Sequence, residues 1–362
     1  METLLNNDKK YTILLAPLDW GLGHATRCIP IITGLLHLGH QVIIGADRAQ
    51  AALLKEAFPE LTVLTLKGYD IQYSTNSRFF ALKIATQLPK ILQSVAYENQ
   101  WLKQIIKEHQ IDLVISDNRY GLYCEAIPCI FITHQLTIKA PFKWMEHLLR
   151  KINYIYINRF TRCWVPDMDG ELNIAGELSH PSQLPKTPVH YINLLSRFKP
   201  IESVQKFDYC VLLSGPEPQR TVFENIIVES IKKMHGTILL VRGKPLEKTI
   251  PFVADNITVY NHLKVDELSK AIQESKFILC RSGYSTIMDL LILKKKMILV
   301  PTPGQTEQEY LARLLMQKNL AISVKQTDFN LDEILEKAKI FKFKQREVKA
   351  FDAQELINLL NF

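Results

Sequence analysis

The chain has 362 residues, of which 47% are hydrophobic and 22% charged, a composition typical of a globular protein with two domains rather than of a membrane or disordered protein. Its net charge of +7 is compatible with anionic partners, but no zinc-finger spacing or RNP-like aromatic motif supports a nucleic-acid partner. The six cysteines form no CxxC pair and no histidine cluster accompanies them, which argues against a metal site and for reduced, mostly buried thiols.

Strands and helices alternate along the first half of the chain. Residues 11–18 form an apolar strand that ends in the turn Gly21-Leu22-Gly23-His24, and a helix with apolar residues at helical spacing follows and stops at Gly39. We expect further strands at 41–45, 61–66, 112–116 and 129–133, and helices at 49–57 and about 79–108. This alternation predicts a parallel sheet covered by helices on both faces.

The same alternation restarts in the second half. We expect strands at 209–213, 237–241, 257–260, 277–280 and 297–300, with helices at 265–274 and 285–293. Between the halves, Arg197-Phe198-Lys199-Pro200 interrupts the pattern. We therefore predict two doubly wound α/β domains, 1–195 and 196–345, followed by a C-terminal helix, 346–362, whose return to the first domain stays open.

The turn after the first strand contains a candidate catalytic residue, His24. Open α/β sheets bind ligands beyond the carboxyl ends of their strands, and glycines there let a ligand approach the backbone. A titratable imidazole at that edge is suited to act as a general base near neutral pH. The alternative is a histidine that caps a helix, and we favour catalysis over it. A dinucleotide fingerprint is weak, because the third glycine of GxGxxG does not follow Gly21 and Gly23.

Asp117 is the second candidate, because it follows the strand at 112–116 and should lie at the same sheet edge as His24. A carboxylate that accepts a hydrogen bond from one imidazole nitrogen fixes the tautomer and raises the basicity of the other nitrogen. A loop or capping carboxylate is an equally good interpretation of this residue from the sequence alone.

A third motif joins the strand at 277–280 to a helix through the small residues Ser282 and Gly283. Ser285 and Thr286 offer hydroxyls and amides to a phosphate at the helix N-terminus. Asp289 lies one turn further on the same face, where a carboxylate suits ribose hydroxyls. A plain capped helix is the alternative, and it accounts for Ser285 but not for the whole run.

A fourth motif follows the strand at 297–300. A Pro/Gly loop that includes Gly304 leads into a polar helix start. Glu307 and Gln308 in that helix start are suited to bind sugar hydroxyls. The alternative is an ordinary loop between a strand and a helix.

With their spacing, the third and fourth motifs resemble the donor-binding half of the GT-B glycosyltransferases. The group that the chain resembles most contains the lipid-II-forming N-acetylglucosaminyl transferase and the UDP-glucuronosyl and UDP-glucosyl transferases. The resemblance covers most of the chain and is strongest over 276–315. It implies two Rossmann-like domains facing across a cleft, with acceptor binding in the N-terminal domain and nucleotide-sugar donor binding in the C-terminal domain.

The resemblance also implies roles for single residues. In that group a Gly-x-Ser-Thr turn holds the diphosphate, the acidic residue at Asp289 holds the ribose, and the acidic-Gln pair touches the sugar. The N-terminal Gly-x-Gly-His is similar to an acceptor-side loop whose histidine is the proposed base, with a partner aspartate at the place of Asp117. The further residues that it implies are the acceptor-loop glycines Gly21 and Gly23, the phosphate-loop residues Ser214 and Gly215, and the base-contacting His262 and Leu263.

The implied activity is that of an inverting, metal-independent hexosyltransferase. It would move a hexose or N-acetylhexosamine from a UDP-sugar to a hydroxyl of a lipid-linked or cell-envelope glycan. No cofactor is expected beyond the UDP-sugar as co-substrate, and no metal, although Asp167-Met168-Asp169 has the spelling of a metal-binding DxD motif. A nucleotide-sugar 2-epimerase on the same fold and a catalytically silent nucleotide-sugar-binding protein are the alternatives.

The segment 137–162 is basic and rich in aromatic residues, with Glu146 as its one acidic residue. Such a segment fits an anionic membrane surface. A partly buried helix with snorkelling lysines is the alternative, which we favour slightly. For the basic stretch 337–349 we favour a solvated helix face. The polar N-terminus does not resemble a signal peptide, so we expect a cytoplasmic protein, with peripheral attachment to the inner face of the membrane left open.

Overall fold

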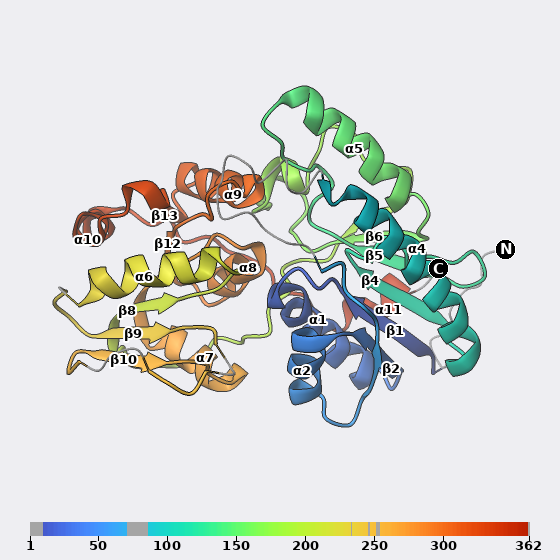
Figure 1. Cartoon of the computed structure of the whole chain (residues 1–362), viewed down its shortest axis with the longest axis horizontal. Coiled ribbons are helices and arrows are strands. Elements are labelled where there is room, and N and C mark those ends of the chain that lie inside the picture. The colour runs from blue at the N-terminus through green and yellow to red at the C-terminus, as the bar shows by residue number, and fades with distance from the viewer. Residues whose placement is uncertain (1–9, 71–85, 233, 245–246, 251–253, 361–362) are drawn as a thin grey trace. The chain divides into compact units, whose positions relative to one another are not determined.

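The computed structural model describes the chain except for residues 1–9, 71–85, 233, 245–246, 251–253 and 361–362. The described residues form two compact units (Figure 1). The first takes its residues from 10–70, 86–197 and 348–360, and the second from 198–347. The chain therefore changes unit after Arg197, inside the Arg197-Phe198-Lys199-Pro200 interruption.

A seven-stranded sheet forms the centre of the first unit, in the order β3-β2-β1-β4-β5-β6-β7, and every strand pair in it is parallel. Its strands are β1 (Thr12–Pro17), β2 (Gln41–Ala46), β3 (Thr62–Thr65), β4 (Leu113–Asp117), β5 (Cys129–Ile132), β6 (Arg162–Val165) and β7 (Val189–Tyr191). Its helices are α1 (Leu22–His37), α2 (Arg48–Ala57), α4 (Leu88–His109), α5 (Lys143–Ile157), the 3-10 turns η2 (Gly170–Leu172) and η3 (Gly176–Leu178), and α11 (Glu355–Leu360).

A six-stranded parallel sheet forms the centre of the second unit, in the order β10-β9-β8-β11-β12-β13. Its strands are β8 (Phe207–Leu212), β9 (Ile238–Val241), β10 (Ile257–Tyr260), β11 (Ser275–Cys280), β12 (Lys296–Leu299) and β13 (Ala321–Ser323). Its helices are α6 (Gln219–Ile231), α7 (Val265–Gln273), α8 (Tyr284–Ile292), α9 (Thr306–Gln317), the 3-10 turn η4 (Gln326–Asp328) and α10 (Leu331–Ile340).

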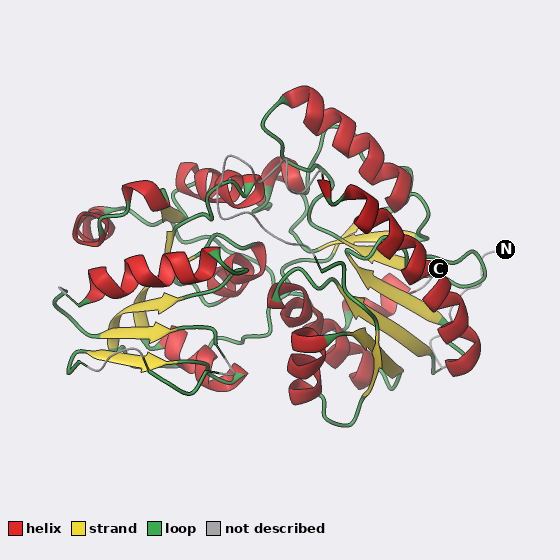
Figure 2. Ribbon diagram, viewed as in Figure 1, coloured by secondary structure: helices red, strands yellow, loops and turns green. Residues whose placement is uncertain are grey.

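Both sheets have the doubly wound topology that the alternation predicts, so that prediction is confirmed. The order of the strands reverses between β1 and β4 in the first sheet and between β8 and β11 in the second. In this topology the carboxyl ends of the two strands beside the reversal form the usual ligand-binding edge. Figure 2 shows the strands at the centre of each unit with helices on either side.

The C-terminal segment returns to the first unit. The amide of Leu194 donates to the carbonyl of Lys349 at 3.0 Å, and Arg162 donates to the carbonyl of Leu359 at 2.8 Å. A Cβ added to Gly34 on α1 would lie 2.7 Å from Leu356 Cδ1, so the glycine is what lets α11 pack against α1. The helix expected at 346–362 is shorter than predicted, because α11 begins at Glu355.

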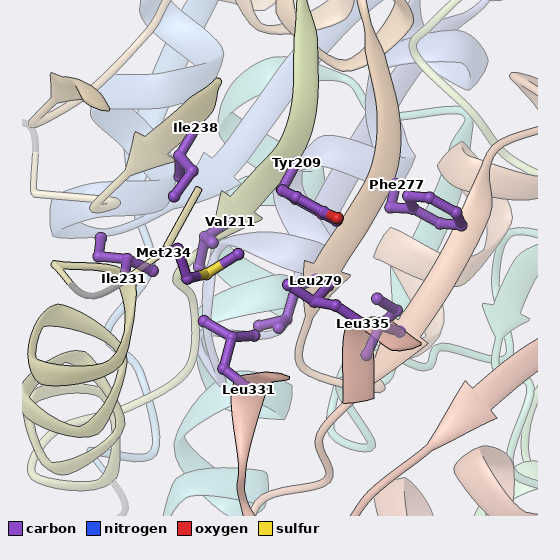
Figure 3. Close-up of a pocket in the computed structure, with 10 residues that line it drawn as sticks. Tyr209, Val211, Ile231, Met234, Ile238, Phe277, Leu279, Leu331 and Leu335 are labelled. Atoms are coloured by element: carbon purple, nitrogen blue, oxygen red, sulfur yellow. The ribbon is translucent and has the colours of Figure 1, made fainter. Parts of the chain in front are cut away.

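The core of the second unit contains a small void, which Figure 3 shows among side chains from α6, the strands and α10. Its volume is about 10 Å³ and its lining is almost entirely hydrocarbon, with Tyr209, Met234 and Phe277 among the lining residues. A cavity needs roughly 10–15 Å³ to hold one water molecule, so this is a packing gap and not a ligand site.

Two further expectations concern the cysteines and the basic stretch 337–349. All six cysteines are free thiols, and five of them are buried, as the sequence predicts. The basic stretch 337–349 is helical only as far as Ile340, where α10 ends, and residues 341–349 have no regular secondary structure. In the described part of the chain, no helix combines the length and the apolar character that crossing a bilayer requires.

Candidate active site

The candidate base lies at the carboxyl edge of the first sheet. Asp117 is the last residue of β4, and it pairs in register with Pro17 at the end of β1 and with Ile132 at the end of β5. After β1 the chain turns through Gly21 into α1, which carries His24 in its first turn. The sheet register thus brings together two residues 93 positions apart in the sequence.

His24 and Asp117 are in contact. The imidazole Nδ1 lies 3.2 Å from Asp117 Oδ2, and the side chains are 15% and 0% exposed, respectively. Because Nδ1 faces the carboxylate, Nε2 is the nitrogen left for a substrate proton. Burial and the neighbouring Arg27 guanidinium lower the pKa of His24, against the raising effect of Asp117, so the neutral imidazole is the form present at neutral pH.

Two residues that the sequence did not suggest complete this cluster. Arg27 Nε donates to Asp117 Oδ2 at 2.8 Å, and Arg27 NH2 pairs with the other carboxylate oxygen. His134, just after β5, lies 3.2 Å from Arg27 NH1 through its Nδ1. Arg27 follows His24 by three residues on α1, and His134 follows a strand end. Helical spacing from His24 could have identified Arg27, and the position after a strand end could have identified His134.

The carboxyl of Asp117 is ionised in this setting. Burial alone would raise the pKa of Asp117, but the Arg27 guanidinium and the His24 imidazole outweigh burial and hold that pKa well below its usual range. The thiol of Cys28 also points at Asp117 Oδ2, at 3.6 Å. Burial, followed by the nearby Asp117 charge, raises the pKa of Cys28 well above its usual value, so this thiol stays protonated.

A second buried ion pair fixes the loops that carry the cluster. Arg119 donates to the carbonyl of Pro17 at 2.7 Å and to Glu98 Oε1 at 2.9 Å. Glu98 Oε2 in turn accepts from the hydroxyl of Tyr69 and the amide of Gly121, both at 2.9 Å. The chain segments after β1, β3 and β4 are thereby tied to helix α4, which makes the edge rigid.

The glycines predicted for the acceptor loop lie between β1 and α1 and in the first turn of α1. Gly21 has a φ of +90°, a conformation that glycine adopts without strain, and no described atom lies within 4 Å of the position of an added Cβ. Gln50 Nε2 donates to the carbonyl of Gly21 at 3.3 Å and holds the turn. Gly23 is in the first turn of α1, and its carbonyl accepts from the Thr26 hydroxyl at 3.0 Å.

In the second unit, the third and fourth motifs meet at one sheet edge. Cys280 at the end of β11 pairs in register with Leu212 of β8 and Leu299 of β12. The hydroxyl of Ser282 donates to the carbonyl of Gln308 at 2.9 Å, and Gln308 Oε1 accepts from the amide of Thr302 at 2.9 Å. The predicted phosphate turn and the predicted sugar motif are therefore neighbours.

The start of α8 has no side-chain cap in the part of the chain that the structure describes. Gly283 is the N-cap residue and no side chain caps the helix, so a plain capped helix is not what these residues form. Ser285 and Thr286 lie in the first turn, and Asp289, 8% exposed, follows one turn later. No described atom lies within 4 Å of an added Cβ at Gly283 or at Gly215, which has a φ of +103° in the loop after β8.

A buried arginine lies beneath this turn. The guanidinium of Arg281 donates to the carbonyls of Val300, Pro301 and Gln219 and to Gln326 Oε1, and it lies 4.0 Å from the ring centroid of Phe223. Burial lowers the pKa of Arg281 to about 9, which still leaves the side chain protonated at neutral pH. This positive charge favours an anion at the turn, and the sequence analysis did not identify it.

The remaining predicted donor residues lie at the same edge. Ser214 follows β8 directly before Gly215, and Gly304, whose amide donates to Glu309 Oε1 at 3.0 Å, follows β12. Glu307 lies in the first turn of α9. His262 and Leu263 follow β10, which β9 and β8 separate from β11, so they lie furthest from the phosphate turn.

The aspartates of the DxD-like sequence Asp167-Met168-Asp169 have structural roles. Asp167 is fully buried and accepts from the amides of Ile174 and Ala175 at 2.9 and 3.0 Å and from the Ser179 hydroxyl at 2.6 Å. Asp169 caps η2 by accepting from the amide of Gly170 at 2.8 Å. Among the residues that the structure describes, no group of three or more His, Cys, Asp or Glu side chains is placed to hold a metal ion.

Helix α5 presents large apolar side chains to solvent. Trp144, Leu148, Ile152 and Ile155 recur at helical spacing and are 67%, 50%, 43% and 60% exposed. Phe142, directly before the helix, is 60% exposed and stacks on Trp144 with ring centroids 6.4 Å apart. The apolar stripe of this basic segment therefore faces outward, while Asn153 and Ile157 on the opposite face of the helix are buried, so the helix is partly buried as the sequence slightly favoured.

Comparison with known proteins agrees with this arrangement. Residues 12–339 match the protein family described as "Glycosyl transferase family 1". A UDP-N-acetylglucosamine--N-acetylmuramyl-(pentapeptide) pyrophosphoryl-undecaprenol N-acetylglucosamine transferase of Haemophilus ducreyi is 23% identical, over 86% of this chain and 85% of that protein. An uncharacterized glycosyltransferase of Methanosarcina acetivorans is 21% identical, over 80% of this chain and 79% of that protein.

Solved structures share the fold. The calicheamicin glycosyltransferase CalG4 superposes with a TM-score of 0.63 at 12% identity, covering 92% of this chain and 90% of that structure. MurG of Acinetobacter baumannii superposes with a TM-score of 0.56 at 14% identity, covering 97% of this chain and 99% of that structure. The two doubly wound units are thus those of the GT-B glycosyltransferases.

Proposed function

The chain belongs to glycosyl transferase family 1, and on that premise we propose that it transfers a sugar from a UDP-sugar to a hydroxyl group of a lipid-linked or cell-envelope glycan. The reaction class follows from the family. The single observation that carries the mechanism is the 3.2 Å contact between His24 Nδ1 and Asp117 Oδ2 at the carboxyl edge of the first sheet.

We assign the base chemistry to the first unit. Nε2 of His24 removes the proton of the acceptor hydroxyl, and the oxygen attacks the anomeric carbon as the nucleoside diphosphate leaves. Asp117 holds the imidazole in place and stabilises the imidazolium that forms. Attack by the acceptor itself, in one displacement, inverts the anomeric centre.

We assign donor binding to the second unit. Ser285, Thr286 and the amides at the start of α8 would bind the diphosphate, because an uncapped helix N-terminus attracts negative charge. The buried Arg281 cation beneath the turn adds to this attraction. Asp289 would bind the ribose, and Glu307 with Gln308 the sugar. These groups stabilise the leaving diphosphate, so the proposed reaction needs no metal ion and no cofactor.

A lipid-linked acceptor has separate support. The Haemophilus ducreyi relative is named for transfer to a pyrophosphoryl-undecaprenol substrate. In this chain, the exposed stripe Trp144, Leu148, Ile152 and Ile155 is bordered by the exposed Lys151, and Lys143 at the start of the helix is 81% exposed. An outward apolar stripe with flanking cations is the pattern of a helix that lies in the interface of an anionic membrane.

The test is a donor screen that measures nucleoside diphosphate release and analyses the products, with and without bacterial lipid extracts. His24→Ala should lower turnover about 10²–10⁴-fold, the usual effect of losing a general base, and leave donor affinity unchanged. His37→Ala, an exposed histidine in the last turn of the same helix, is the matched control. Full turnover of His24→Ala, or an epimerised sugar nucleotide as the product, would overturn the proposal.

A further inference from the structure

Arg27 is the residue that the proposed mechanism does not use, although it touches every polar member of the His24 cluster. Its side chain is 2% exposed. Nε and NH2 reach the two oxygens of the Asp117 carboxylate, Nε at 2.8 Å. A guanidinium that meets both oxygens of a carboxylate forms the strongest type of side-chain ion pair, with fixed geometry.

The same guanidinium also touches both histidines. Its NH2 lies 2.9 Å from His24 Nδ1, and its NH1 lies 3.2 Å from His134 Nδ1. Among the residues that the structure describes, the titratable and charged groups that face His24 are Arg27 on its own helix, Asp117 at the end of β4 and His134 after β5. The Cys28 thiol contacts the same carboxylate oxygen as His24 does, at 3.6 Å.

The charge of a buried carboxylate raises the pKa of a neighbouring histidine. The uncompensated negative charge holds a proton on the imidazole, and an imidazolium cannot accept the proton of a hydroxyl group. Arg27 supplies the opposite charge within the same cluster. The Arg27–Asp117 pair is neutral as a whole, and burial then disfavours a charge on His24.

We propose that Arg27 is a positioning residue for the base, which cancels the charge of Asp117 and thereby keeps His24 neutral and ready to accept a proton. This inference rests on the proposed function, in which His24 removes the acceptor proton.

The contact with Nδ1 gives Arg27 a second effect on His24. Arginine only donates, so Nδ1 accepts from Arg27 NH2 in the tautomer that carries its proton on Nε2, and donates to Asp117 Oδ2 in the other. Only the second tautomer leaves Nε2 free to accept a proton. Asp117 favours this competent tautomer, whereas the hydrogen bond from Arg27 NH2 favours the other, so this contact opposes the electrostatic effect of Arg27.

The pH profile of kcat/KM tests the proposal in the full-length protein. Arg27→Gln removes the positive charge and should raise the pKa of the acidic limb of the kcat/KM profile by about 1–3 units. The variant should therefore lose activity near neutral pH and regain it at alkaline pH. Arg27→Lys keeps a positive charge and should move the limb much less. A loss of kcat/KM that is the same at every pH, with the limb in place, would mean that Arg27 is merely structural and would overturn the proposal.

A second measurement works without substrates. The pKa of His24 is read from its imidazole resonances by NMR titration, assigned by their disappearance in His24→Ala. The charge-balanced double variant Arg27→Gln with Asp117→Asn should have a higher His24 pKa than Asp117→Asn alone, since only the single variant keeps the cation. Equal pKa values in these two variants would refute the electrostatic role of Arg27.

The two proposals fail separately. If His24→Ala keeps full turnover, the base assignment is wrong, but the NMR titration still reports whether Arg27 sets the charge state of His24. If the titration shows no effect of Arg27 while His24→Ala is inactive, the base assignment stands and the inference about Arg27 is wrong.

Discussion

Asp117→Asn should destabilise the first unit strongly. The substitution keeps the shape of the side chain but removes its charge, and the buried Arg27 guanidinium loses the carboxylate that it contacts. Asp117 is fully buried, and Arg27 Nε lies 2.8 Å from it. Breaking a buried ion pair by removing one partner costs about 3–5 kcal/mol, and we expect a loss of that size in the free energy of unfolding.

The chain offers a selective probe for this experiment. All four tryptophans, Trp20, Trp101, Trp144 and Trp164, belong to the first unit, so their fluorescence during urea unfolding reports on that unit alone. The matched control is Asp112→Asn at the start of the same strand segment, where Oδ2 accepts from the amide of Thr12 at 2.8 Å. A midpoint for Asp117→Asn no lower than that of the control would refute the reasoning.

The same pair predicts how stability depends on pH. Burial opposes ionisation of Asp117, but Arg27 and His24 hold the folded-state pKa of its carboxyl below the unfolded value of about 3.9. A carboxyl with a depressed pKa stabilises the fold fully above the unfolded pKa, and this contribution is lost as the pH falls toward the folded pKa. The wild-type unfolding midpoint should therefore fall steeply below about pH 4, and Asp117→Asn should lack that part of the fall.

Three further predictions concern ligands and membranes. Asp289→Ala should raise the dissociation constant of UDP about 30-fold or more by calorimetry, and the exposed Asp266→Ala should not; equal affinities would remove Asp289 from the donor site. Turnover should survive EDTA, and loss on chelation with recovery on adding Mg²⁺ would contradict the metal-free mechanism. Leu148→Glu should reduce cosedimentation with phosphatidylglycerol vesicles about tenfold. Leu172→Glu, where the leucine is also 50% exposed, should not reduce it. Equal losses in the two variants would show that α5 does not contact the membrane.

Much of the architecture could be predicted because its signals are local. Apolar runs of strand length between helical patterns predict β1, β4 and β11 within a residue or two. The strands β7 and β13 went unpredicted because three residues at a sheet edge, only partly apolar, carry too short a pattern to recognise.

The candidate site was predictable only in part. His24 and Asp117 stand out because each follows a strand end, and parallel strands bring such ends to one edge. The role of Arg27 depends on which side chain faces it across the sheet, and the register that pairs Pro17 with Asp117 is a property of the fold. Arg281 likewise looks like an ordinary residue of the turn after β11 until its burial is seen.

The return of the chain to its first unit has a consequence for biosynthesis. A ribosome releases residues 198–347 before residues 348–360, so the second unit can fold while the first still lacks its closing piece. Until then Leu356 is not yet present to pack on α1 at Gly34, and the carbonyl of Leu359 is not yet present to accept from Arg162. The unit that is synthesised first is therefore the one completed last, and a fragment ending at Arg197 would remain an unfinished domain.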